Sequence, residues 1–237
     1  VSGQNPTVTV TSLAPDGNYI VYAYAVDVAG NRSAYVCSEG VVVDSTAPAI
    51  SNIVAPSKEA STLTDTTATI SFTGSEAGTY FYMIKESSET APTTITDFAT
   101  EQANDGYSTW TANANISSAT MTADADNKIT LSDLKANTEY TLYIAAVDQA
   151  GNSIQTIASQ NFTTCKTMPK VADADMPKIS GTYGQTVAEM TLTNGVAKVG
   201  SDVITGTWAV TDSNKANVPA VGTTDTYQVT FTPTDSR

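Results

Sequence analysis

The alternation of apolar and polar side chains predicts short β-strands along almost the whole chain. Val8 and Val10 alternate with threonines, which is the period-2 pattern of a strand with one buried face. A longer strand follows, in which every second residue is expected on one face: Tyr19, Val21, Ala23 and Ala25. The Ala-Gly-Asn sequence after this strand predicts a turn, because glycine readily adopts positive φ and asparagine tolerates it.

The same elements occur a second time. Residues 8–31 and 129–152 align without a gap at a constant offset of 121 positions, and 10 of the 24 aligned pairs are identical. The face of the second long strand is formed by Tyr140, Leu142, Ile144 and Ala146. Both copies end in Asp-x-Ala-Gly-Asn, so the repeated unit is predicted to be a strand, a corner, a longer strand and a turn.

The repeated sequence resembles a known family. Leu-x5-Tyr, followed by an alternating strand that ends in Ala-Val-Asp-x-Ala-Gly-Asn, is similar to strands E and F and the F–G loop of bacterial extracellular fibronectin type III modules. The resemblance implies that Tyr19 and Tyr140 are tyrosine corners, whose hydroxyls bond to the backbone upstream, rather than a ligand-stacking platform. Residues 43–48 resemble the junctions between bacterial immunoglobulin-like repeats.

We therefore expect an all-β protein of tandem β-sandwich modules. Residues 1–47 are expected to be the C-terminal half (strands E, F and G) of a fibronectin type III-like module, and residues 48–168 a complete one. Residues 169–237 resemble a small immunoglobulin-like module of Gram-positive surface proteins that lacks its last strand. Both outer modules are thus expected to be truncated. The main expected strands of the second and third modules are 68–72, 78–84, 179–187, 190–195, 204–210 and 227–233.

The second module is longer than a usual sandwich, and the extra residues are expected at about 86–127. Within them, Ile95, Phe98 and Gln102 have helical spacing, which predicts a short helix over 93–103. Its apolar side is interpreted as a lid over the sandwich. The alternative is a ligand site in this insertion, which a cluster of exposed aromatic rings around Tyr107 and Trp110 would favour.

The amino-acid composition excludes several kinds of catalytic site and makes some classes of partner poor candidates. The 237 residues include no histidine, which removes the commonest general base and the usual catalytic triads. The net charge of −13 makes nucleic acids and anionic membranes poor partners. The apolar runs are too short to span a bilayer. The two cysteines, Cys37 and Cys165, lie in different modules and are expected to be free.

Only calcium deserves consideration as a metal, because the available ligands are oxygens. In a fibronectin-type sandwich the B–C and F–G loops lie at the pole where strand A begins. Asp44, Glu76, Asp148 and Asn152 are therefore expected to converge on a junction calcium site. A simpler interpretation, which the sequence favours, is that Asp148 and Asn152 only cap their own turn.

Together these features predict a non-catalytic structural or spacer segment of a secreted or cell-wall-attached bacterial surface protein. The alternative is an adhesive binding module for a host protein or a carbohydrate. No enzymatic activity, no nucleic-acid partner and no membrane insertion are expected, and no cofactor beyond calcium. The chain is expected to be an extracellular monomer.

Overall fold

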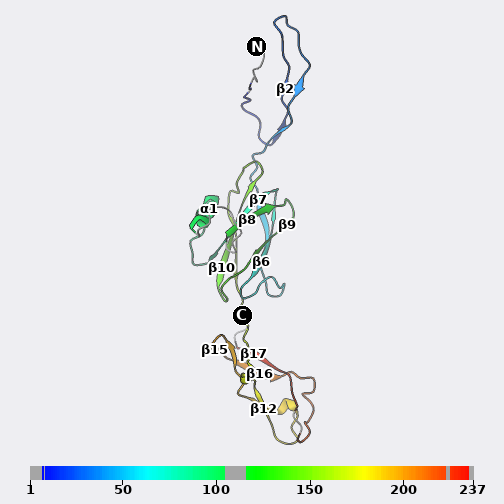
Figure 1. Ribbon diagram of the computed structural model, residues 1–237, viewed down its shortest axis with the longest axis vertical. Helices are drawn as coiled ribbons and strands as arrows, with labels where there is room; N and C mark the ends of the chain where they lie inside the picture. Colours follow the sequence, from blue (N-terminus) through cyan, green and yellow to red (C-terminus); the bar gives the residue numbers. More distant parts are fainter. Residues whose placement is uncertain (1–6, 8, 105–115, 223–224, 235–237) are drawn as a thin grey trace. The chain divides into compact units, whose positions relative to one another are not determined.

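The computed structural model describes residues 7, 9–104, 116–222 and 225–234 (Figure 1). The chain divides into two compact units. Unit 1 comprises Val1–Thr62, Thr67–Asp133 and Glu139–Phe162, and unit 2 comprises Leu63–Thr66, Leu134–Thr138 and Thr163–Arg237. None of the helices in the described part of the chain has the length and hydropathy that a membrane span needs.

A two-layered sandwich of antiparallel strands forms the main body of unit 1. One sheet has the order β5–β6–β9, and the other has the order β11–β10–β7–β8. With the strands named along the chain, the first sheet is A–B–E and the second contains G–F–C, as expected of a fibronectin type III-like module. The bounds of these strands are β5 (Ile50–Val54), β6 (Ala68–Gly74), β7 (Gly78–Glu86), β8 (Ile116–Met121), β9 (Asp126–Leu131), β10 (Glu139–Asp148) and β11 (Ala158–Thr163).

The core of the sandwich follows from the period of two in its strands. Alternate residues of β6 are buried, and they include Ile70 and Phe72. The Phe72 ring meets the Tyr80 ring of β7 edge to face, with 5.0 Å between centroids. From β10, Leu142 and Ile144 are fully buried. The expected all-β class and the expected strands 68–72 and 78–84 are confirmed.

Strand β10 is covered on both faces, because helix α1 (Ile95–Asn104) packs on the side away from the sandwich core (Figure 1). Phe98 of the helix is completely buried in a cluster with Met83, Ile116 and Ala145. The expected helix over 93–103 is thus confirmed, displaced by one or two residues. Its apolar side is a lid over the sheet, whereas Tyr107 and Trp110 lie outside the described residues.

Residues 17–43 of unit 1 form a separate antiparallel hairpin. Strand β1 (Gly17–Tyr19) pairs with β4 (Val41–Val43), and β2 (Tyr22–Ala23) pairs with β3 (Val36–Cys37). The Tyr19 hydroxyl donates a hydrogen bond to the Ala14 carbonyl at 2.9 Å, which confirms this tyrosine corner. The expected strand at residues 8–10 is wrong for the described residues 9 and 10, which are not in a strand.

Residues 169–237 form three two-stranded antiparallel sheets in their described part. The pairs are β12 (Lys178–Ser180) with β13 (Thr191–Thr193), β14 (Ala197–Val199) with β15 (Asp202–Ile204), and β16 (Gly206–Val210) with β17 (Val229–Pro233). Two 3-10 turns, η1 (Asp173–Asp175) and η2 (Val187–Glu189), precede β12 and β13.

The Trp208 side chain connects two parts of this region. Its ring lies 5.0 Å from that of Phe231, and its indole N–H donates to the Gly195 carbonyl at 3.2 Å. A Cβ atom at position 195 would come within 2.6 Å of the indole, so only glycine fits there. The expected strand over 179–187 is mostly wrong. Strand β12 ends at Ser180, and Thr186 and Glu189 form a capping box that starts η2 within the expected strand.

The lid interpretation of helix α1 predicts the cost of removing its buried ring. Phe98→Ala is expected to lower the free energy of unfolding of unit 1 by about 3 kcal/mol, since the lost ring leaves a cavity against Met83. Urea unfolding followed by circular dichroism measures the change. The control is Thr100→Ala on the exposed side of the helix, with an expected change within about 0.5 kcal/mol. Equal losses in both variants would contradict the lid.

Candidate functional site

The turn after strand β10 is built around one carboxylate. Asp148 Oδ1 accepts hydrogen bonds from the backbone N–H groups of Gly151 at 2.7 Å and Asn152 at 2.8 Å. Its Oδ2 accepts a third from the Asn152 side-chain amide at 2.7 Å. Gly151 has a φ of +97°, which favours glycine at this position. Asp148 and Asn152 therefore cap their own turn, which is the first part of the simpler interpretation.

The first copy of the repeat builds the same turn. Asp27 accepts from the Asn31 backbone N–H at 2.9 Å and from the Asn31 side-chain amide at 2.8 Å. Gly30 has a φ of +91°, close to the value at Gly151. The Asp-x-Ala-Gly-Asn sequence therefore encodes a side-chain-capped turn in either context.

The second turn has an additional contact that reaches the segment before strand β5. The Asn152 amide also donates to the Asp44 carbonyl at 3.1 Å. On its other side, this segment is held by Asp16, the residue directly before the hairpin, whose Oδ1 accepts the Ser45 backbone N–H at 2.8 Å. The segment around Asp44 is thus fixed from the hairpin and from the sandwich. We call Asp44–Pro48 the joint.

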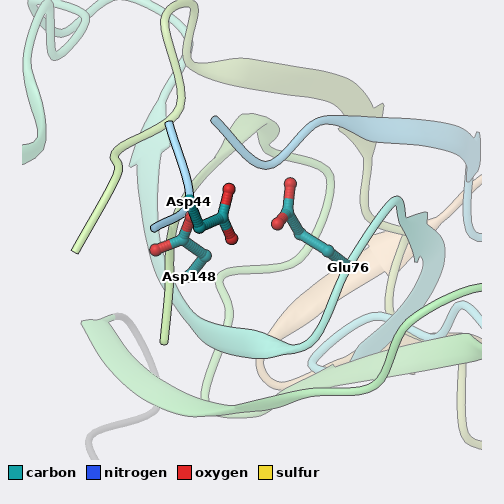
Figure 2. A group of neighbouring side chains, drawn as sticks. All are labelled: Asp44, Glu76 and Asp148. Atoms are coloured by element: carbon teal, nitrogen blue, oxygen red, sulfur yellow. The ribbon is translucent and has the colours of Figure 1, made fainter. Parts of the chain in front are cut away.

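Three carboxylates meet beside the joint. Asp44 belongs to the joint itself, Glu76 to the turn between β6 and β7, and Asp148 to the turn after β10. One oxygen from each lies within 4.8 Å of those from the other two. In Figure 2 the Glu76 carboxylate points toward those of Asp44 and Asp148. The structure therefore brings together all three acids of the expected site, and Asn152 lies against two of them through its hydrogen bonds.

The surroundings of Glu76 and Asp148 shift the pKa values of these two carboxyl groups in opposite directions. Burial raises the pKa of Glu76, and the negative charges of Asp44 and Asp148 raise it further. Burial also acts to raise the pKa of Asp148, but the hydrogen bonds from Asn152, Gly151 and Ala150 outweigh it, so this pKa is lowered. Asp148 therefore stays ionised, and the repulsion is expressed at Glu76.

The geometry suits a hard divalent cation. Calcium–oxygen distances are about 2.3–2.6 Å, so two oxygens on one ion lie no more than about 5 Å apart. The 4.8 Å limit among Asp44, Glu76 and Asp148 meets this condition. Three carboxylates, each able to bind through one or two oxygens, could supply much of a six- to eight-coordinate shell.

Sequence reasoning missed the part played by Asp16. Besides Ser45, its carboxylate accepts from the Thr46 hydroxyl at 3.4 Å. The hydrogen bonds from Ser45 are the main reason that the pKa of Asp16 is lowered. The available signal was the Pro-Asp-Gly turn, in which Asp16 adopts a φ of +58°. The Pro-Asp-Gly sequence predicts the turn but not the residue that donates to Asp16, because Ser45 lies 29 positions further along the chain.

Comparisons with known proteins add little to this description. No family model matches the chain, and no curated protein matches it. A solved structure of the chicken CNTN1 FN1–FN3 domains is similar over 65% of this chain, with 16% identity and a TM-score of 0.32. The chain covers 45% of that structure's length, which is less than half. The fibronectin type III-like fold is accordingly assigned from the strand order of the sandwich itself.

The raised pKa of Glu76 predicts how stability depends on pH without divalent cations. A raised folded-state pKa contributes stability that is complete below the usual glutamate pKa and is lost as pH rises through the folded value. Glu76→Gln is thus expected to be more stable than the wild type at pH 7, by up to about 1 kcal/mol after solvent screening. The difference should vanish near pH 4.

Thermal unfolding at several pH values in a chelating buffer measures this difference. The matched control is Glu59→Gln, an exposed acid of the same unit, which should not differ from the wild type at either pH. A Glu76→Gln variant that is less stable than the wild type at pH 7 would contradict the repulsion inferred for this cluster.

Proposed function

We propose that the chain is a non-catalytic spacer segment of a modular bacterial surface protein, secreted or attached to the cell wall, and that calcium rigidifies its joint. The observation that carries this proposal is the meeting of Asp44, Glu76 and Asp148 beside the joint within 4.8 Å. Each acid comes from a different part of unit 1. An ion bound to all three therefore links the segment after the hairpin to two turns of the sandwich.

Electrostatics supports a cation at this position. Residues 48–168 contain 13 acidic and 5 basic side chains, so this stretch carries a net charge of −8. The cluster concentrates part of that charge, and the raised pKa of Glu76 reflects the resulting repulsion. A divalent ion relieves this repulsion without protonation. Extracellular modules bind calcium with dissociation constants of about 10⁻⁴–10⁻³ M, which suits an extracellular location.

The hydrogen bonds of the joint support a mechanical function. Asp16 and Asn152 hold the joint from opposite sides, so its backbone is already positioned before any ion binds. Calcium then has only to stiffen a preformed connection. A spacer that transmits force benefits from joints that do not bend freely, and the absence of histidine from the sequence is consistent with a segment that catalyses nothing.

The adhesive alternative rests on the insertion at 86–127 and stays a prediction. In the described part of this insertion, the apolar side of helix α1 is used to cover the sheet through Phe98. That packing supports the spacer proposal over a ligand site on the helix.

Calcium is expected to stabilise unit 1 at pH 7. For a dissociation constant of about 1 mM, 10 mM calcium adds about 1.4 kcal/mol, which corresponds to a few degrees in Tm. Scanning calorimetry with and without calcium measures the shift, and isothermal titration measures the affinity. Glu76→Gln should abolish the calcium effect while retaining the fold. A wild-type Tm that does not respond to calcium would contradict the site.

A pair of matched variants separates the ion site from the turn cap. Asp27→Ala and Asp148→Ala each remove the carboxylate that caps an Asp-x-Ala-Gly-Asn turn, but only Asp148 belongs to the cluster. Both variants should lose stability without calcium, and only Asp148→Ala should also lose the response to calcium. Limited proteolysis at the joint reports stiffening directly: calcium should slow cleavage in the wild type and in Asp27→Ala. Equal calcium responses in the two variants would refute the role given to Asp148.

A further inference from the structure

The connection between strands β13 and β14 contains an asparagine and a glycine that the fold favours for separate reasons. Asn194 directly follows β13, is exposed and has a φ of +60°, a left-handed conformation that asparagine adopts more readily than most residues. Gly195 comes next, and a Cβ atom there would lie 2.6 Å from the Trp208 indole. The main-chain conformation and the packing therefore both favour the Asn-Gly sequence at this turn.

An asparagine followed by glycine can lose its side-chain amide without a catalyst. The main-chain nitrogen of Gly195 attacks Cγ of Asn194, and the absence of a side chain on glycine leaves this approach unhindered. As the new N–C bond forms, the Cγ–Nδ2 bond breaks, and ammonia leaves with the proton of the Gly195 amide. Water then opens the cyclic imide at either carbonyl. The products are aspartate and isoaspartate, in which the main chain runs through the additional Cβ atom, and both carry a new negative charge.

The folded turn keeps the reacting atoms apart. Ring closure requires Cβ of Asn194 and the nitrogen of Gly195 to lie on the same side of the Cα–C bond. A residue in the left-handed region has a ψ of about +47°, and at this angle the two atoms lie on nearly opposite sides of that bond. Cγ therefore reaches the nitrogen only after a large rotation of ψ. The reaction accordingly requires the turn to leave its folded conformation.

Two hydrogen bonds directly after Asn194 resist this rotation. The Trp208 indole N–H donates to the Gly195 carbonyl at 3.2 Å. The next residue, Val196, donates its backbone N–H to the Asp175 carbonyl at 2.9 Å. The turn therefore opens only when at least the first of these hydrogen bonds breaks and the indole moves off the glycine.

The side chain of Asn194 adds no restraint of its own. Its amide forms no hydrogen bond with another residue in the part of the chain that the structure describes. The amide of Asn127, by contrast, donates to the Thr122 and Ala125 carbonyls at 3.0 and 3.1 Å. Opening of the main chain is therefore the step that exposes Asn194 to the reaction.

We propose that Asn194–Gly195 is a site of spontaneous deamidation that the fold controls: the pair is protected while Trp208 holds Gly195, and it reacts once the turn opens. The change is irreversible, because ammonia is lost. The isoaspartate product also lengthens the main chain beside Gly195. The glycine carbonyl then no longer fits the Trp208 indole N–H, so a turn that has opened and reacted does not close again in its original form.

The full chain allows a direct comparison of the folded and unfolded states. It is incubated at neutral pH, in buffer alone or in enough urea to unfold it. Trypsin then releases residues 179–198, a peptide whose only asparagine is Asn194. Mass spectrometry detects the replacement of the amide by a hydroxyl group, and chromatography separates aspartate from isoaspartate. Deamidation should be at least about tenfold slower in the folded chain. Equal rates in the two states would overturn the proposal.

A substitution at Trp208 tests whether this contact is the one that protects the pair. Trp208→Phe keeps an aromatic ring but removes the N–H donor, and one lost hydrogen bond corresponds to about a fivefold larger open population. Deamidation should therefore accelerate about fivefold in buffer and not at all in urea. The matched control is Phe98→Ala, which destabilises unit 1 and should leave the rate unchanged. Equal acceleration in both variants would contradict a specific role of Trp208.

A second measurement does not depend on the folding of the Trp208 variant. In the wild-type chain, the rate should rise with urea at concentrations below the unfolding transition, because opening of the turn exposes surface. A rate that ignores urea in this range would show that the folded turn reacts directly, against the proposal.

Variants of Asn194 separate the effect of the new charge from that of the longer main chain. Asn194→Asp carries the charge on an ordinary main chain and should keep the Tm of the wild type, since the side chain is exposed. A wild-type sample enriched in isoaspartate should have a lower Tm. Asn194→Gly cannot deamidate at this position and should keep its Tm during the same incubation. An isoaspartate sample as stable as the unreacted chain would contradict the predicted loss of the Trp208 contact.

Discussion

The joint depends on the hydrogen bonds that the Asp148 carboxylate accepts from its own turn. They fix the turn after β10 and hold the Asn152 side chain where it can also reach the Asp44 carbonyl. Without this cap, the Asn152 side chain would lose the position from which it donates to the Asp44 carbonyl. The same cap requires an ionised carboxylate at this point, because the charged form accepts hydrogen bonds most strongly. The local stability of the turn and the negative charge beside the joint therefore have one origin.

The negative charge of Asp148 influences the protonation of Glu76 in the same cluster. Asp148 is stabilised in its ionised form by its donors, so it does not relieve repulsion by taking up a proton. The repulsion falls on Glu76, which lies in the neighbouring turn and has a raised pKa. The cluster can be relaxed by a proton on Glu76 as the pH falls, or by a bound cation. This competition is why the stability of the joint is expected to respond to both pH and calcium.

The sequence allowed the local features of the fold to be predicted, and most of the errors concern partners that lie far along the chain. The capped turns, the Tyr19 corner, strands β6 and β7 and helix α1 each depend on residues close together in sequence or on a clear period. The convergence of Asp44, Glu76 and Asp148 could be anticipated only through the resemblance to fibronectin type III modules, which supplied the loop positions. The hydrogen bond from Ser45 to Asp16 joins residues that no sequence period relates, and it was missed.

The two copies of the repeat show why local and long-range structure differ in predictability. The turns at Asp27 and Asp148 have the same hydrogen bonds although their surroundings differ. The strands do not behave in this way: Ile129–Leu131 form part of β9, whereas residues 9 and 10 are not in a strand. A capped turn satisfies its polar groups internally, but a strand requires a neighbour for its backbone and a cover for its apolar face. A repeated sequence therefore determines its turns wherever it occurs, while each of its strands forms only where a neighbouring strand pairs with it.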